Sequence, residues 1–207
     1  MKIITIVVGM VQTNCYLVVD ENNNEAAVID PGGNPVLIES KIEELGLRPV
    51  GILLTHGHFD HIMAVDALRT TYKIPIFAGE AEKDLLADAK LNGSGMVRKN
   101  ITLEADEWLL NGAFIFGLKV IHTPGHTAGS VCFYHQNENV LFSGDTLFRE
   151  SFGRTDFPTG DFEMLKNSIK QKLFTLPENT AVYPGHGEKT GIGYEKKKNM
   201  IWEFSQT

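Results

Sequence analysis

The sequence has little cysteine, relatively few cationic side chains and no long apolar run. Its two cysteines, Cys15 and Cys132, lie far apart in 207 residues. Each stands in a short apolar stretch, which excludes a disulfide-rich secreted scaffold and predicts buried free thiols in a reducing compartment. Lysine and arginine number 19 against 26 acidic residues, a formal net charge of −7, so the chain lacks the broad positive field that binds phosphate backbones. No apolar run reaches the length of a membrane span. We therefore expect a cytoplasmic protein whose partners include neither nucleic acid nor a membrane.

The rest of the composition is that of an ordinary folded domain. Hydrophobic residues make up 43% and charged residues 22% of the chain, which is typical of globular proteins. A chain of this length buries a sizeable core without help from disulfides. Residues 3–11 are apolar behind Lys2, but no small-residue cleavage site follows them. An opening pair of strands joined by a polar turn is therefore the better interpretation than a signal peptide.

Short apolar strands alternate with segments of helical spacing along the chain. Pro35 can open a helix that Gly46 ends. Asp161 is a plausible N-cap for a helix through Lys172, and two more helices are predicted at residues 62–68 and 81–89. There is no internal repeat and no low-complexity linker, so we expect one α/β domain over residues 1–207. The predicted strands cover residues 26–29, 52–54, 74–78, 114–121, 130–134, 140–142 and 181–183.

Four of these strands end in a cluster of polar residues. In open α/β sheets, ligands gather beyond the carboxyl ends of the strands, so such clusters can converge on one site. Glycines stand beside several of them and allow the backbone to approach closely. The clusters are Thr55-His56-Gly57-His58-Phe59-Asp60-His61, His122-Thr123-Pro124-Gly125-His126, Ser143-Gly144-Asp145 and Pro184-Gly185-His186-Gly187.

Six of the seven histidines, and two aspartates, fall in these clusters. His122, before the Thr-Pro turn, is interpreted as a supporting or structural residue, which leaves five histidines as candidate ligands. Imidazole and carboxylate together suit zinc, iron or manganese better than calcium. Seven ligands are too many for one tetrahedral ion and fit two ions that share a carboxylate, with Asp145 as the natural bridge. In an extended segment His56 and His58 project to the same side. The candidate ligands are His56, His58, Asp60, His61, His126, Asp145 and His186.

The charge of such a centre favours an anionic substrate. Two divalent ions, two aspartates and a bridging hydroxide leave a net charge of about +1. This charge would stabilise an oxyanion or thiolate as it develops, and the overall acidity of the chain does not oppose it, because the ions dominate locally.

The motifs, in this order, resemble those of the metallo-β-lactamase superfamily. The T-H-x-H-x-D-H signature is matched at residues 55–61, and the later clusters and Val28-Ile29-Asp30-Pro31-Gly32 match further family motifs. The resemblance implies an α/β (α+β) fold, a four-layer αββα sandwich with metals at one edge. Within the superfamily the chain is most similar to glyoxalase II, and specifically to its short single-domain bacterial hydrolases. Asp60 separates it from the β-lactamases that carry cysteine there.

The resemblance also implies a division of the ligands between two metals. Metal 1 would take His56, His58 and His126, metal 2 would take Asp60, His61 and His186, and Asp145 would bridge. Asp60 and Asp145 thereby belong to the catalytic centre. The ions would be zinc, with iron or manganese as alternatives. Asp30 would orient the ligand loop from behind; the other interpretation of Asp30 is a plain turn residue before Pro-Gly.

The implied reaction is hydrolysis of a small-molecule thioester. A hydroxide that bridges the metals would attack the carbonyl of S-D-lactoylglutathione or a related hydroxyacyl thioester, without a side-chain nucleophile. Only about twenty residues follow His186, so we expect no separate C-terminal helical domain that grips glutathione. Where related enzymes have a Lys-x-Tyr for glutathione, this chain has Arg154-Thr155-Asp156. Arg154 can bind a substrate carboxylate or form an ion pair with Asp156 or Asp161.

Other functions on the same scaffold remain as alternatives. Persulfide dioxygenases are oxidoreductases with one iron held by two histidines and one aspartate, and they resemble this chain at residues 153–157. The complete set of second-metal ligands favours hydrolysis over that chemistry. A nuclease would need a basic surface, and a non-catalytic binding protein would be expected to lack some ligands.

Overall fold

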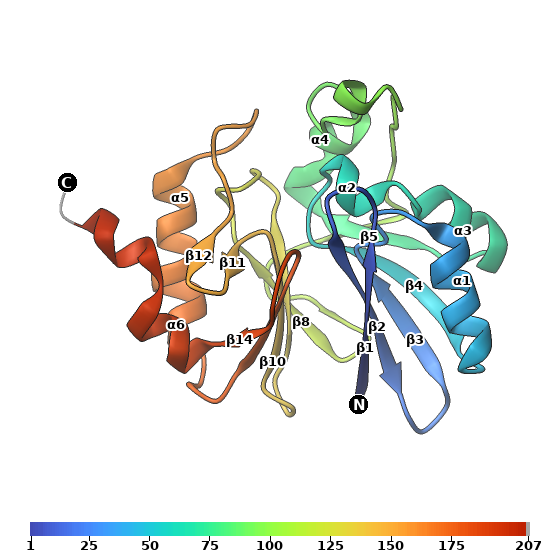
Figure 1. Cartoon of the computed structure of the whole chain (residues 1–207), viewed down its shortest axis with the longest axis horizontal. Coiled ribbons are helices and arrows are strands. Elements are labelled where there is room, and N and C mark those ends of the chain that lie inside the picture. Colours follow the sequence, from blue (N-terminus) through green and yellow to red (C-terminus); the bar gives the residue numbers. More distant parts are fainter. Residues whose placement is uncertain (206–207) are drawn as a thin grey trace. The chain divides into compact units, whose positions relative to one another are not determined.

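The computed structural model describes residues 1–205, and the chain divides into two compact units at Leu109 and Leu110. Each unit is built on a six-stranded sheet with helices (Figure 1). This confirms the mixed α/β class. The expectation of one domain over residues 1–207 stays a prediction.

The sheet of the first unit has the order β1-β2-β3-β4-β5-β6. Strands β1 to β3 are antiparallel, as expected for the opening strand pair, and β3 to β6 run parallel. The registers pair Ile29 with Leu53, and Leu54 with Ala78. The carboxyl ends of β3, β4 and β5 therefore meet at one edge. The strands are β1 (Lys2–Val8), β2 (Thr13–Asp20), β3 (Glu25–Ile29), β4 (Arg48–Leu54), β5 (Ile76–Gly79) and β6 (Glu107–Leu109).

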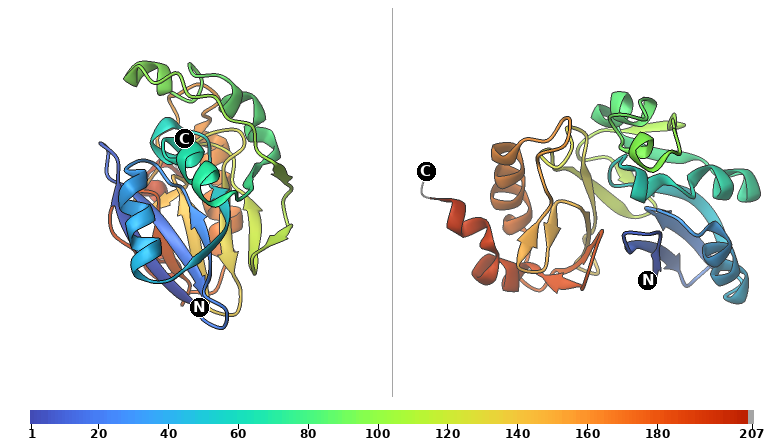
Figure 2. Two further views of the ribbon diagram at one scale, coloured as in Figure 1. Left: turned by 90° about the vertical axis from the view of Figure 1, so that its right-hand side faces the viewer. Right: turned by 45° about the horizontal axis from the view of Figure 1, so that its top comes forward.

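Helices α1 and α3 cover one face of this first sheet (Figures 1 and 2). Ile38 and Ile42 of α1 and Val65 and Leu68 of α3 join the buried core that the strands supply, which includes Leu17 and other fully buried side chains. The helices are α1 (Pro35–Glu44), α2 (Phe59–Ile62), α3 (Val65–Tyr72), η1 (Glu80–Glu82), α4 (Lys83–Ala87) and η2 (Ser94–Val97).

The sheet of the second unit has the order β14-β13-β10-β9-β8-β7. Only the β10–β13 pairing is parallel, and it aligns Phe142 with Tyr183 and Gly144 with Pro184. The loops after these two strands therefore begin side by side. The strands are β7 (Phe114–Ile115), β8 (Leu118–His122), β9 (Val131–His135), β10 (Val140–Gly144), β13 (Ala181–Pro184) and β14 (Thr190–Gly191), with β11 (Leu147–Phe148) and β12 (Ser151–Phe152) forming a separate hairpin.

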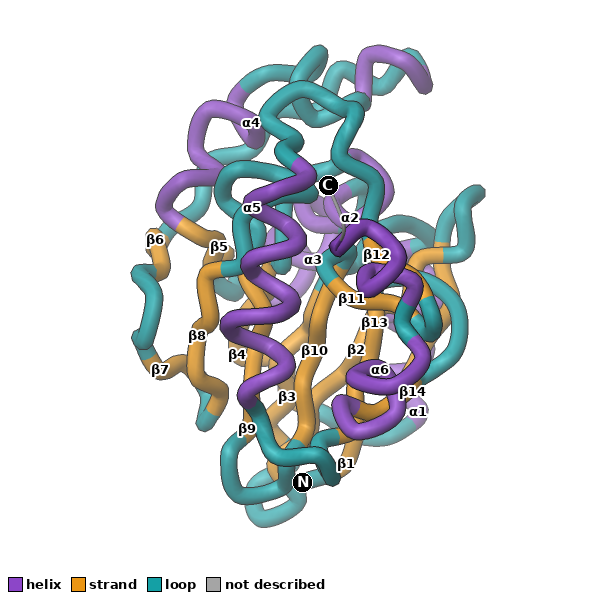
Figure 3. The backbone as a smooth tube through the Cα atoms, turned by 90° about the vertical axis from the view of Figure 1, so that its left-hand side faces the viewer, coloured by secondary structure: helices purple, strands orange, loops and turns teal. Residues whose placement is uncertain are grey.

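Helices also cover the second sheet, and α5 lies over β8, β9 and β10 (Figure 3). Leu165, Ile169 and Leu173 pack with Cys132 and Leu141 in a buried core. Asp161 caps α5 as predicted, because its side chain accepts a hydrogen bond from the Met164 amide at 2.8 Å. The helices are α5 (Phe162–Asn167), the π-helix η3 (Ser168–Lys172), η4 (Leu173–Thr175), α6 (Ile192–Lys198) and η5 (Met200–Ser205).

Two predicted elements are divided in the structure. The helix predicted at residues 62–68 is interrupted by a turn at Met63 and Ala64, which separates α2 from α3. The strand predicted at residues 114–121 is a hairpin, because Phe116 and Gly117 have positive φ values of 49° and 78°. Both cysteines are buried free thiols, as predicted. Within residues 1–205, no helix is long and apolar enough to span a membrane.

Candidate functional site

The first unit gathers its polar residues where parallel strands end. Asp30 follows β3, the segment from Thr55 to His61 follows β4 and runs into α2, and η1 follows β5. Because these strands share one direction, their carboxyl ends bring together residues that are 25 or more positions apart in sequence.

Asp30 is the hydrogen-bond centre of this cluster. Its side chain is 1% exposed. One carboxylate oxygen accepts a bond from the Thr55 amide at 2.8 Å, and the other accepts from the Thr55 hydroxyl at 2.6 Å. The second oxygen also lies 3.0 Å from His61 Nδ1. A neutral His61 that donates from Nδ1 presents the lone pair of Nε2 to a metal. These contacts are compatible with a residue that orients a ligand, and this role of Asp30 stays a prediction.

The His56-Gly57-His58 turn is held from both sides. The ring centroids of His56 and His58 are 4.9 Å apart in an edge-to-face arrangement, and His61 lies 4.1 Å from His56. The Gly57 amide donates to Glu82 Oε1 at 2.9 Å. A Cβ atom on Gly57 would lie 2.7–2.9 Å from the side chains of Leu86 and Leu85, so a larger residue there would require these leucines to move.

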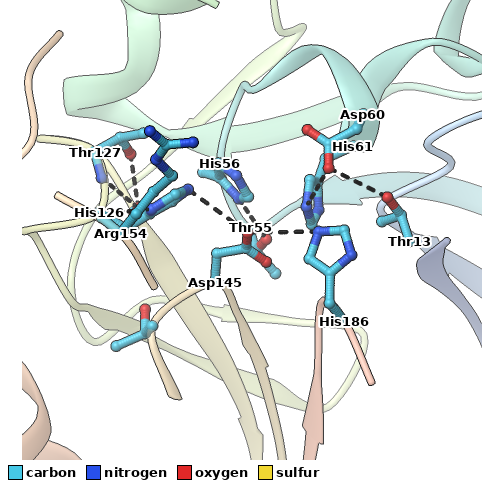
Figure 4. Close-up of polar contacts among 12 residues, drawn as sticks. Thr13, Thr55, His56, Asp60, His61, His126, Thr127, Asp145, Arg154 and His186 are labelled. Atoms are coloured by element: carbon cyan, nitrogen blue, oxygen red, sulfur yellow. Dashed lines mark hydrogen bonds and ion pairs between the residues drawn. The ribbon is translucent and has the colours of Figure 1, made fainter. Parts of the chain in front are cut away.

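Asp60 stands in the first turn of α2, beside His61. Its Oδ2 accepts a bond from the Thr13 hydroxyl at 3.3 Å and lies 3.6 Å from His61 Nε2 (Figure 4). The backbone of Gly32 packs tightly against this turn, since a Cβ atom there would lie 1.6 Å from the Asp60 carbonyl oxygen. The absence of a side chain at Gly32 therefore allows the first turn of α2 to pack directly against the Gly32 backbone.

The second unit brings together the other three candidate ligands. Oδ2 of Asp145 lies 3.7 Å from His126 Nε2 and 3.6 Å from His186 Nε2 (Figure 4). One carboxylate oxygen thus faces two imidazoles from different loops. A Cβ atom on Gly153 would lie 1.8 Å from the Asp145 carbonyl oxygen, so this loop also closes on a glycine.

The loop that carries His126 is fixed by hydrogen bonds to its ring and backbone. His126 Nδ1 lies 2.7 Å from the Arg154 carbonyl oxygen, which directs Nε2 toward Asp145. From the helix beside it, Ser168 donates to the Pro124 carbonyl at 2.8 Å and Lys172 to the His122 carbonyl at 2.7 Å. Partial burial lowers the pKa of Lys172. A π-helical segment thus supports a ligand loop.

Arg154 forms an ion pair with Asp156. Two guanidinium nitrogens donate to the two carboxylate oxygens at 2.6 Å each, and the guanidinium lies 3.9 Å from the centre of the Phe157 ring. The hydrogen bond from Arg154 lowers the pKa of Asp156 to about 2. Both side chains are exposed. A substrate carboxylate would compete with Asp156 for this cation, and the role of Arg154 in substrate binding stays a prediction.

The donor atoms in each unit fit a metal better than they fit hydrogen bonds to one another. Three Nε2–Oδ2 pairs are separated by 3.6–3.7 Å: His61–Asp60, His126–Asp145 and His186–Asp145. Hydrogen bonds span about 2.7–3.2 Å, whereas two ligands about 2.0–2.1 Å from one tetrahedral zinc ion lie roughly 3.3–3.4 Å apart, which is nearer to the observed separations. Asp30, His56 and His61 also offer atoms within 4.8 Å of one another, but the oxygens of Asp30 already accept from Thr55 and His61.

The structure adds supporting residues that sequence patterns did not indicate. Thr13 and Glu82 contact the ligand segment from β2 and η1, and Ser168 and Lys172 support the His126 loop. None belongs to a motif. The usable signal was indirect: Glu82 follows the end of a strand parallel to β4, at the same edge as the ligands.

Comparison with known proteins identifies the family of the sequence. The metallo-beta-lactamase superfamily pattern matches residues 8–186 and so spans both units. "Probable metallo-hydrolase YqgX" of Bacillus subtilis is 42% identical over 198 residues, 93% of each chain. "Hydroxyacylglutathione hydrolase GloC" of Haemophilus influenzae is 39% identical over 207 residues, 96% of this chain and 97% of the relative.

Solved structures agree with this assignment. The crystal structure of BLEG-1 B3 metallo-beta-lactamase matches with a TM-score of 0.91 at 44% identity, covering 96% of this chain and 98% of the other. The crystal structure of TTHA1623 in a di-iron-bound form matches with a TM-score of 0.88 at 37% identity, covering 95% and 98%.

Proposed function

Since this chain belongs to the metallo-beta-lactamase superfamily, we propose that it is a dinuclear metal-dependent hydrolase of small-molecule thioesters. The proposed substrates are hydroxyacyl thioesters of the S-D-lactoylglutathione type. The relative named hydroxyacylglutathione hydrolase supports this choice, because its match extends over nearly the whole of both chains. A cytoplasmic location, where such thiols are kept reduced, is part of the proposal.

The position of Asp145 is the observation that carries the proposal. A carboxylate oxygen 3.6–3.7 Å from two separate imidazole nitrogens supports the proposal that two ions share this ligand. We assign His56, His58 and His126 to one ion and Asp60, His61 and His186 to the other. Zinc is the proposed metal, and the di-iron-bound form of a relative makes iron the alternative.

The ions, when bound, would supply a nucleophile at neutral pH and positive charge for the transition state. The residues of the chain hold the ligands in the protonation states that this needs. Asp30 keeps the Nδ1 proton on His61, and the Arg154 carbonyl does the same for His126. Arg154 is the proposed contact for a carboxylate of the thiol moiety, in competition with Asp156.

Metal analysis together with a substrate panel tests this function. The purified protein should hold about two ions per chain, hydrolyse S-D-lactoylglutathione or another hydroxyacyl thioester, lose this activity with a chelator and regain it with zinc. The panel should include thioesters of other thiols, lactones, β-lactams and glutathione persulfide. Absence of thioester hydrolysis with zinc, iron and manganese alike would refute the proposal. Oxygen consumption on the persulfide with one iron per chain would assign an oxidoreductase instead.

A further inference from the structure

Glu82 is a carboxylate buried in the first unit, outside every family motif described above. It ends η1, directly after β5, and is 1% exposed. Burial of an ionised carboxylate is costly unless hydrogen bonds compensate for the lost water. Its Oε1 accepts a bond from the Gly57 amide at 2.9 Å, and Gly57 is the residue between His56 and His58. The carboxylate therefore contacts the backbone of the ligand turn itself.

We propose that Glu82 is a positioning residue that fixes the His56-Gly57-His58 turn for metal binding. The inference rests on the metal site of the proposed function and does not depend on which substrate is hydrolysed. A hydrogen bond from an amide to an ionised carboxylate is shorter and stronger than one between neutral groups. Because the Gly57 amide lies between the two histidines, its rotation would move both imidazoles.

The packing around Gly57 leaves the orientation of its peptide plane to be set by this hydrogen bond. Leu85 and Leu86, which follow Glu82 on α4, pack so closely that a Cβ atom on Gly57 would lie 2.7–2.9 Å from their side chains. Apolar contact alone limits how far the turn can move toward α4, but it does not fix the rotation of the peptide plane. The hydrogen bond to Glu82 supplies that restraint. In segment 82–86, the two leucines thus limit movement of the turn, and Glu82 fixes the orientation of the Gly57 peptide plane.

Imidazole orientation is the property that depends on this restraint. The rings of His56 and His58 stand edge to face, with centroids 4.9 Å apart and planes at 88°. Metal–nitrogen bonds require the nitrogen lone pair to point at the ion, so a small rotation of the turn weakens both bonds together. Loss of the hydrogen bond between Glu82 and the Gly57 amide should therefore reduce the free energy of metal binding more than the free energy of unfolding of the metal-free protein.

Two conservative substitutions separate the hydrogen bond from the charge. Glu82→Gln keeps the length of the side chain and one acceptor oxygen but removes the charge. Glu82→Asp keeps the charge but is one methylene shorter and cannot reach the Gly57 amide without backbone movement. Glu80, an exposed residue in the same short helix, provides matched controls in Glu80→Gln and Glu80→Asp.

The experiment measures zinc affinity by competition with a chelator, and the visible spectrum of the cobalt-loaded protein, which responds to ligand geometry. Thermal unfolding of the metal-free variants checks that they fold. We expect Glu82→Asp to weaken zinc binding about 10–100-fold and to change the cobalt spectrum, as is typical when a group behind a ligand is lost. Glu82→Gln should stay within about threefold of the parent protein, and both Glu80 variants should match the parent.

Several results would overturn the inference. Equal affinity and spectra for Glu82→Asp and Glu80→Asp would show that the Gly57 contact does not position the ligands. A loss for Glu82→Gln as large as that for Glu82→Asp would assign the effect to charge. A protein that binds zinc as expected but hydrolyses no thioester would refute the proposed function and leave this inference intact.

Discussion

Substitution of Asp30 by asparagine should weaken metal binding without unfolding the protein. Asp30 has a positive φ of 50°, a left-handed conformation that asparagine also adopts readily. The two side chains have the same shape, so the backbone and the packing of the turn should be preserved. What changes is the hydrogen bonding, because one oxygen that accepts becomes an NH₂ group that donates.

The expected loss of metal affinity follows from the three hydrogen bonds that the Asp30 carboxylate accepts. If the asparagine oxygen faces the Thr55 amide, its NH₂ group faces His61 Nδ1, which favours the tautomer whose proton is on Nε2 and so removes the lone pair needed by a metal. If the amide is flipped, the buried Thr55 amide loses its acceptor, at about 1–3 kcal/mol. In the first orientation metal affinity should fall about 10–100-fold, or roughly 1.4–2.7 kcal/mol.

Chelator competition on the Asp30→Asn protein measures this change, with Asp66→Asn as the control. Asp66 is exposed on α3, so this variant has the same loss of charge without the hydrogen bonds. The reasoning would be refuted if Asp30→Asn bound zinc as tightly as the control. That result would make Asp30 a turn residue, because asparagine serves equally well in a turn.

Three further substitutions test other parts of the structure. Asp145→Ala should reduce bound metal from two ions toward none and abolish thioester hydrolysis, and parental turnover in this variant would contradict the bridging role. Arg154→Ala should raise the KM for thioesters with an anionic thiol moiety several-fold at unchanged kcat, whereas an unchanged KM would leave Arg154 structural. In that variant the pKa of Asp156 should rise from about 2 toward its ordinary range, as NMR titration can show. A carboxyl group whose pKa is lowered on folding contributes stability that is complete above its unfolded pKa and is lost as the pH falls toward its folded pKa. Above about pH 5, the way in which the free energy of unfolding depends on pH should therefore be the same in Arg154→Ala and in the parent protein. Glu195→Ala removes a buried carboxylate that accepts from the Glu150 amide at 2.9 Å and from Asn199 at 2.7 Å, so denaturant unfolding should show a loss of about 2–4 kcal/mol, and a loss below about 0.5 kcal/mol would contradict this estimate.

The sequence predicted the ligand clusters because local rules govern them. A buried strand followed by polar residues and glycine is visible within ten positions, and parallel strands bring such ends to one edge. The role of Asp30 was suggested by the family resemblance, and its hydrogen bonds to Thr55 and His61 could not be predicted from the sequence. Contacts across 25 or more residues depend on register, which a single sequence does not specify.

Residues outside the motifs were missed for a related reason. Glu82 looks like any other helix-forming glutamate, and only the fold places it at the Gly57 amide. The β7–β8 hairpin was missed although Gly117 stands in its turn, because the other turn position holds Phe116, and phenylalanine is unusual at positive φ and typical of a strand. The turn at Met63 and Ala64, which divides the predicted helix, contains neither glycine nor proline that would have indicated it.

The tight approach of Gly32 to Asp60, and of Gly153 to Asp145, has a consequence for protein engineering and genome mining. A methyl group at either position would collide with the main chain of an acidic residue that we assign to the metals. A mutant library that preserves all seven proposed metal ligands but randomises these two glycines should consist mostly of inactive proteins. Searches that score only the coordinating residues would rank such inactive sequences beside competent ones, and requiring both glycines would separate the two groups.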